Sequence, residues 1–187
     1  MAMTTIDELF EHELKDIYGA EQRLLEALDE MAAETTDPDA RKAFQQHRKE
    51  TQNQIKRLDR VFKSIDMKPE AQPCPGLEGL IKEKKALAKE KPSEEILSFS
   101  NLHAAQKVER YEITAYEGLI EAAEHLGLDE AAKLLSQNLE EEEAALNKLK
   151  ALASEYDVEE LRMSAGEDQE EEEEEEEMIA AGPRRRR

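Results

Sequence analysis

Helix-breaking residues gather at three places in this sequence and leave four long stretches that each have the period of an α-helix. The breaks are the turn at 35–38, the proline- and glycine-rich segment 67–92 and the turn at 126–129. Between them, apolar residues recur at alternating steps of three and four, which is the spacing of one helix face. No run of alternating β-branched residues lies between turn signals. The sequence therefore predicts an all-α chain.

Residues that suit helix termini mark the ends of the predicted helices. The predicted bounds are about 5–34, 38–66, 77–89, 93–126 and 129–155. Thr5 and Glu8 have the spacing of a capping box, in which each side chain bonds an unpaired backbone N–H group. Asp37 suits an N-cap, and Gly127 suits the position after the last residue of a helix. Asp129 is predicted to cap the last helix.

The lengths of the connections predict how the helices are arranged. Short links join the first pair and the last pair of long helices, so each pair is expected to form an antiparallel hairpin. The link between the hairpins spans 67–92 and contains the short helix. It is long enough to cross the full length of a bundle. Four long helices with one long crossover describe a ferritin-like four-helix bundle.

Polar residues interrupt the apolar stripe of every long helix near its middle. The inward carboxylates are Glu21 on the first helix, Glu50 on the second (with Thr51 as the neighbouring alternative), Glu109 and Glu112 on the third and Glu142 on the fourth. Glu21 lies 15 residues before residue 36 in the first turn, and Glu50 lies 14 after it. Glu112 and Glu142 each lie 15 residues from the second turn at residue 127. At about 1.5 Å per residue, these carboxylates are predicted to share one layer.

Several ionised carboxylates cannot share a dry core, because burial and mutual repulsion raise their pKa values and weaken the fold. Two divalent cations remove both penalties, and carboxylate oxygens suit ions such as iron and manganese. The layer therefore predicts two bound metal ions, iron or manganese. The predicted bridging ligands are Glu50 and Glu142, and the predicted terminal ligands are Glu21, Glu109 and Glu112.

The same residues also have ordinary interpretations. In a chain with 46 acidic residues, some glutamates fall on an inward stripe by chance. His47 has three interpretations: a metal ligand, a residue that hydrogen-bonds a ligand, or a core histidine with other partners. Tyr18 and Tyr116 lie one turn from Glu21 and Glu112, where they either donate hydrogen bonds to them or only pack.

The charge of the chain restricts its partners. The formal net charge is −20, which argues against nucleic acid or an anionic membrane surface as a partner. No apolar run approaches the roughly 20 residues that span a bilayer. The opening residues are polar and acidic, so no signal peptide is predicted. Cys74 is the only cysteine, which excludes an internal disulfide. We expect a cytoplasmic location.

Four stretches of this sequence resemble the YciE/YciF group of ferritin-like stress proteins. They are ELKDIYGAE at 13–21, 47–54, AAQKVERYEI at 104–113 and 139–142. The stretch with Glu109 and Glu112 is the most specific, and the resemblance covers about residues 3–163. It implies a di-metal carboxylate bundle, often dimeric, with a stress association and no settled reaction. Glu109 and Glu112 also resemble the paired glutamates on the third helix of rubrerythrin-type proteins.

The sequence departs from the usual ferritin-like pattern in its second and fourth helices. Those helices usually carry Glu-x-x-His, in which the histidine supplies a nitrogen ligand. Here Asn53 follows Glu50 by three residues, and Ala145 follows Glu142 by three. His47 precedes Glu50 instead. The departure leaves the carboxylate layer in place but changes the source of any nitrogen ligand.

We divide the chain into a bundle, residues 1–163, and a tail, residues 164–187. The tail holds eight consecutive glutamates and ends in four arginines, and we expect charge repulsion to keep it disordered. The leading hypothesis is a homodimeric stress protein that oxidises Fe(II) or scavenges peroxide, with O₂ or peroxide as the oxidant. The alternative is a non-enzymatic helical scaffold whose acidic tail binds basic partners. An iron-storage shell ranks below both, because no fifth, shell-forming helix follows the fourth.

Overall fold

A computed structural model describes residues 3–157, 159, 161 and 162, so the predicted tail lies outside the described residues. The described part contains helices and no strand, which confirms the all-α prediction. The helices are α1 (Ile6–Glu34), α2 (Pro38–Ser64), α3 (Pro75–Ala88), α4 (Glu94–His125) and α5 (Asp129–Ser154). Their bounds lie within two residues of those predicted. None of the described helices is both long and apolar enough to cross a bilayer.

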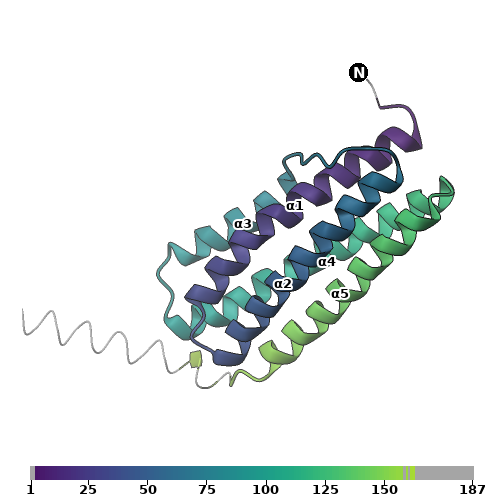
Figure 1. Cartoon of the computed structure of the whole chain (residues 1–187). Coiled ribbons are helices and arrows are strands. Elements are labelled where there is room, and N and C mark those ends of the chain that lie inside the picture. Colours follow the sequence, from purple (N-terminus) through teal and green to yellow (C-terminus); the bar gives the residue numbers. More distant parts are fainter. Residues whose placement is uncertain (1–2, 158, 160, 163–187) are drawn as a thin grey trace, which may run out of the picture.

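The four long helices lie side by side around a shared core (Figure 1). α1 packs against α2 and α4, and α5 packs against α4 and α2. The turn between α1 and α2 lies beside the start of α4, where the Thr36 N–H group donates to Ser98 Oγ at 3.0 Å. The turn between α4 and α5 lies at the other end (Figure 1). Each long helix is therefore antiparallel to both of its neighbours.

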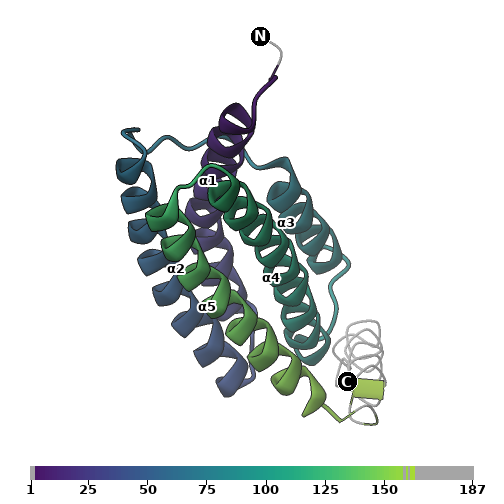
Figure 2. The same cartoon turned by 90° about the vertical axis from the view of Figure 1, so that its right-hand side faces the viewer.

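The link between α2 and α4 returns the chain along the outside of these helices and contains α3 (Figure 2). α3 packs on α4 and buries Leu77 and Ile81. Lys85 of α3 also forms an ion pair with Glu30 of α1, at 2.9 Å. The short helix thus covers the seam between α1 and α4.

Three of the predicted caps are confirmed, and one is wrong. Thr5 forms the capping box, and the Asp37 side chain caps α2. Gly127 follows α4 with a φ of +69°, a left-handed conformation that glycine adopts without strain. The N-cap of α5 is Leu128, without a side-chain hydrogen bond, and Asp129 is already the first helical residue. There its carboxylate still interacts favourably with the helix dipole.

The link after α2 lies directly against α1 at Gly19. The Gln72 N–H group donates to the Lys15 carbonyl at 3.2 Å, and its side-chain amide donates to the His12 carbonyl at 2.9 Å. A Cβ atom added at Gly19 would lie 2.0 Å from the Gln72 carbonyl oxygen. Only glycine fits at this contact, which lies two residues before Glu21.

The buried polar side chains form two main groups within a mostly apolar core. One group joins the turn between α1 and α2 to the start of α4: Thr35, Ser98 and Asn101. The second group lies in the middle of the long helices: Glu21, His47, Thr51, Gln54, Glu109, Glu112, Asn138 and Glu142. The second group contains the candidate site.

Candidate metal centre

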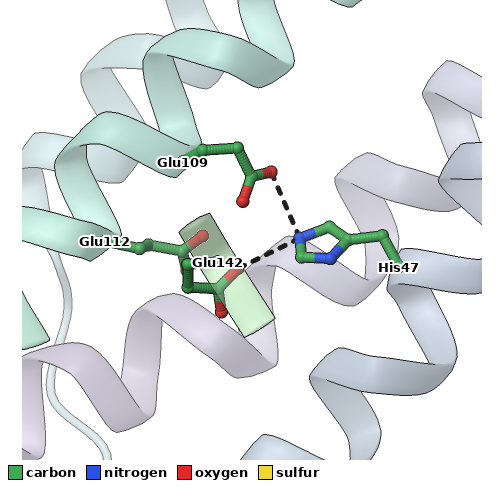
Figure 3. Close-up of side chains that lie close together, drawn as sticks. All are labelled: His47, Glu109, Glu112 and Glu142. Atoms are coloured by element: carbon green, nitrogen blue, oxygen red, sulfur yellow. Dashed lines mark ion pairs between the residues drawn. The ribbon is translucent and has the colours of Figure 1, made fainter. Parts of the chain in front are cut away.

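Five ionisable side chains from all four long helices meet in the middle of the core. They are Glu21 of α1, His47 of α2, Glu109 and Glu112 of α4 and Glu142 of α5, and none is more than 6% exposed. Four of them, all but Glu21, each offer one ligand atom, and these atoms lie within 4.8 Å of one another (Figure 3). We call these five residues the carboxylate cluster.

His47 reaches into this cluster from α2. Its Nε2 atom lies 3.2 Å from Glu109 Oε1 and 3.6 Å from Glu142 Oε2 (Figure 3). Neither ring nitrogen makes a hydrogen bond of good geometry with any partner. Both ring nitrogens therefore lie within ion-pair distance of carboxylates, an arrangement that suits either a protonated histidine or a shared metal ion.

A chain of hydrogen bonds holds Glu21 on the other side of the cluster. The Tyr116 hydroxyl donates to Glu21 Oε1, and the Asn138 side-chain amide donates to the Tyr116 oxygen at 2.9 Å. Arg57 donates to Asn138 Oδ1 and, from Nη1, to Glu141 Oε2 at 2.9 Å. The chain runs from a partly exposed ion pair on α2 and α5 to a fully buried carboxylate on α1, and it fixes the orientation of Glu21.

Most polar atoms of the cluster have no hydrogen-bond partner. Six carboxylate oxygens are buried and unpaired: Glu21 Oε2, Glu109 Oε2, both oxygens of Glu112 and both of Glu142. Buried polar atoms are ordinarily paired, and each unpaired one carries a desolvation penalty of about 1–3 kcal/mol or more. These oxygens and the two nitrogens of His47 are the donor set that a hard or borderline metal ion takes. The residues present therefore fit a metal centre.

The surroundings raise the pKa values of the buried carboxylates. Burial raises the pKa of Glu21 to about 7, although the hydrogen bond from Tyr116 acts in the opposite direction. Burial, and then the charges of Glu21 and Glu109, hold the pKa of Glu112 well above its ordinary value. Burial, and then the charge of Glu112, do the same for Glu142. Without a cation, the cluster therefore binds protons.

The histidine side has the opposite balance of forces. Burial alone lowers the pKa of His47, but the nearby carboxylates of Glu109, Glu50 and Glu142 outweigh it and hold that pKa well above its ordinary value. The neighbouring His47 ring lowers the pKa of Glu50. A protonated His47 thus takes the place of a cation beside Glu109 when no metal is bound.

Glu50 does not join the buried layer as the sequence predicted. Its side chain is 35% exposed, and its nearest contact with the cluster is Oε2 at 3.6 Å from His47 Nδ1. Thr51, the alternative, is fully buried and donates to the His47 carbonyl at 3.0 Å. Successive helical residues point about 100° apart, so a small rotation of α2 decides which one faces inward. Glu50 therefore lies at the edge of the cluster.

Sequence reasoning assigned no role to three polar residues beside the site. Gln54 is fully buried and both of its side-chain amide atoms lack a partner. Neither Asn138 nor Arg57 was assigned a role from the sequence. Gln54 stands on the polar stripe of α2, so its position on that helix was the available clue. The bonds between Arg57, Asn138 and Tyr116 join residues far apart in the sequence.

The fold and the carboxylate cluster together define an all-helical protein with a candidate metal centre of buried glutamates and one histidine. Residues 5–162 match a domain family described as a domain of unknown function, DUF892, and the chain belongs to this family. The predicted resemblance to YciF is confirmed. The chain is 42% identical over 154 residues to protein YciF of Escherichia coli K12, a match that covers 82% of this chain and 93% of YciF.

Solved structures agree with this family assignment. The crystal structure of the E. coli stress protein YciF matches with a TM-score of 0.77 and 41% identity, over 81% of this chain and 96% of that one. YcfI from Rhodopseudomonas palustris, for which a structural role is suggested, matches with a TM-score of 0.77 and 43% identity. That match covers 79% of this chain and 94% of YcfI.

Proposed function

We propose that this chain is a ferritin-like four-helix bundle that binds two metal ions, iron or manganese, in the carboxylate cluster. The observation that carries the proposal is the set of buried, unpaired carboxylate oxygens and histidine nitrogens from four helices. His47, Glu109, Glu112 and Glu142 would hold one ion. Glu21 would bind the second ion together with Glu112. The charge of Glu21 raises the pKa of Glu112, so the two carboxylates are close enough to interact.

The proposed activity is oxidation of Fe(II) or removal of peroxide during stress, as a cytoplasmic protein. A relative of high identity, E. coli YciF, is described as a stress protein, which supports the setting. Two bound Fe(II) ions would together supply the two electrons that peroxide needs for reduction to water. The chain itself would hold the ions apart from bulk water, orient Glu21 through Tyr116 and leave His47 neutral once a cation replaces its proton.

Metal uptake tests the proposal directly. Full-length protein exposed to Fe(II) without oxygen should bind about two irons per chain, and added peroxide or air should produce the absorbance of oxo-bridged ferric ions. Glu109→Ala should lower the stoichiometry, because it removes a ligand from a buried site. Glu143→Ala is the matched control, since Glu143 is exposed on α5. Protein that takes up neither iron nor manganese would contradict the proposal.

A structural role without metal is the second candidate, and the raised pKa values of Glu112 and Glu142 favour it. Neutral carboxyl groups are tolerated in a core far better than charged ones. The structural role suggested for YcfI points the same way. On this candidate, Glu142→Gln should destabilise the metal-free protein, because it disturbs a native packing. On the metal-binding proposal the same change should stabilise it, because it relieves repulsion.

The partly exposed leucines of α3 suggest how two chains could associate. We propose a homodimer that uses the outer face of α3, where Leu87 is 43% exposed and Leu80 is half-buried. Solution scattering should give a particle of twice the chain mass, and Leu87→Lys should shift it toward the monomer because it buries a charge in the interface. A large shell-like particle would contradict this assembly.

A further inference from the structure

A cavity of about 140 Å³ reaches the carboxylate cluster from the side of α2 and α5. His47 and Glu109 form part of its wall, so the cavity opens directly onto two of the candidate ligands. Glu50, Glu141 and Lys148 are the other polar residues along it. The exposed position of Lys148 and the partial exposure of the two glutamates place these three at the solvent end.

The rest of the wall is apolar. Seven of the twelve lining residues are apolar, and four of those seven are alanines: Ala43, Ala105, Ala144 and Ala145. Leu28, Phe44 and Leu149 complete the wall and are almost fully buried. Small side chains on α2, α4 and α5 therefore create the space. Ala145 lies three residues after Glu142, where the ferritin-like pattern would place a histidine side chain.

The size and lining of this cavity restrict what it can hold. Apolar cavities of about 150 Å³ in protein interiors accept a benzene molecule. A hydrated metal ion or hydrogen peroxide gains nothing from seven apolar neighbours, because burying polar groups without partners is unfavourable. Ligand pockets typically combine apolar walls with a few polar groups that orient the ligand. Here those groups are His47 and Glu109.

We infer that the cavity is a binding site for a compact apolar molecule or group, the size of a six-carbon ring or a tert-butyl group, with one end at His47 and Glu109. The inference deepens the proposed function and rests on it for its consequence: the oxidant is an organic hydroperoxide rather than hydrogen peroxide. Two Fe(II) ions held by the carboxylate cluster would supply the two electrons for its reduction, which consumes two protons from solvent, breaks the O–O bond and leaves an alcohol and water.

Binding to the full-length, metal-free protein tests the site without any turnover. Benzene and tert-butanol should each raise the unfolding temperature in a saturable way and shift the backbone NMR signals of Ala43 and Ala105. At a ligand concentration ten times Kd, the folded-to-unfolded ratio should rise about elevenfold. No saturable shift with either probe would overturn the inference.

Cavity-filling variants locate the site. Ala145→Leu, at the half-buried outer wall, should weaken benzene binding at least tenfold because its side chain occupies the same space. Ala151→Leu is the matched control, an exposed position on α5 outside the cavity. Equal binding by wild type and Ala145→Leu would overturn the inference. If Ala145→Leu folds poorly, Ala105→Val at the inner wall replaces it, and equal benzene binding by this variant and wild type would overturn the inference. The NMR shifts of the wild-type protein do not depend on either variant.

The iron-loaded protein tests the consequence. Ala145→Leu should slow Fe(II) oxidation by tert-butyl hydroperoxide at least tenfold and leave oxidation by hydrogen peroxide unchanged. An equal effect on both oxidants would overturn the assignment to an organic hydroperoxide. Metal content of the same samples separates the two proposals. Iron uptake without probe binding rejects only the cavity site, whereas probe binding without iron or manganese uptake rejects only the proposed function.

Discussion

The two flanks of the carboxylate cluster are built in opposite ways. On the closed flank, Tyr116 and Asn138 link Glu21 to Arg57 by hydrogen bonds. On the open flank, His47 has no hydrogen bond of good geometry and faces the alanine-lined cavity. A site that only stored ions would need no such difference. The contrast supports the proposal that one flank fixes a metal ligand in place and the other leaves room for an incoming molecule.

The largest effect is expected where the flanks meet, at Glu112. Both of its carboxylate oxygens are buried and unpaired, and it interacts with Glu21 on the closed flank and Glu109 near the open one. Glu112→Ala should therefore abolish binding of both ions, whereas Glu21→Ala should remove only one. Metal analysis after gel filtration measures the stoichiometry. Retention of one tightly bound ion by Glu112→Ala would show that the flanks bind independently.

The pH dependence of the metal-free protein should follow the buried carboxylates. The folded-state pKa of Glu21 is about 7 against an ordinary 4.5, so its stabilisation is complete below pH 4.5 and is lost as pH rises through 7. At 1.36 kcal/mol per pKa unit, the loss is on the order of 3 kcal/mol. The raised pKa values of Glu112, Glu142 and His47 act in the same direction.

Urea unfolding of metal-free protein at pH 5 and pH 8 measures this loss. Glu21→Gln should flatten the difference, because the amide does not titrate. Glu50→Gln should leave it nearly unchanged, since Glu50 is partly exposed and its pKa is lowered rather than raised. Equal stability of the metal-free protein at pH 8 and pH 5 would show that ionising the buried carboxylates does not destabilise the fold.

The hydroxyl of Tyr116 should contribute a smaller but measurable part of metal affinity. Tyr116→Phe removes the hydrogen bond that orients Glu21 and leaves the Asn138 amide with only its longer bond to the Gln54 carbonyl, 3.5 Å. Loss of such supporting hydrogen bonds typically lowers metal affinity about 10–100-fold. Tyr18→Phe is the control, because the Tyr18 hydroxyl bonds Asp59 at 2.8 Å, outside the cluster. Competitive titration with a chelator measures the metal affinity of both variants. Equal losses of affinity would mean that the Tyr116 hydroxyl acts through general packing rather than through Glu21.

The smallest effect is expected at Glu50, the predicted bridging ligand that lies at the edge. Glu50→Gln should change metal affinity by about threefold or less, because a partly exposed carboxylate at 3.6 Å from His47 contributes little. Isothermal titration with Mn(II) provides the measurement. A loss beyond tenfold would mean that Glu50 turns inward when metal binds, and that the open flank closes over the ion.

Much of the fold follows from local signals in the sequence. Caps and breakers act on neighbouring residues, which is why Thr5, Asp37 and Gly127 were assigned correctly. Asp129 was wrong because its neighbour Leu128 already occupies the cap position. Leucine has no side-chain oxygen that could cap a helix, so the sequence carried no signal for Leu128 at this position.

The candidate site was predictable only as far as helical spacing determines it. Glu21, Glu112 and Glu142 lie on inward stripes at matched depth, Glu109 lies one turn of α4 away from Glu112, and the structure brings all four together. The choice between Glu50 and Thr51 depends on the rotation of α2, which tertiary packing decides. The bonds of Arg57 and the cavity arise from side chains on different helices, and no single-helix pattern contains them.

The close contact at Gly19 means that α1 has only one permitted axial position. If α1 advanced or retreated by one residue, the side chain of Tyr18 or Ala20 would collide with the Gln72 carbonyl, since even a Cβ atom there would lie about 2.0 Å from that oxygen. The same one-residue displacement would turn Glu21 by about 100° out of the core. The contact between Gly19 and Gln72 therefore fixes the axial position of α1 relative to the crossover. In a helix shifted by one residue, Glu21 could not reach the other four residues of the carboxylate cluster.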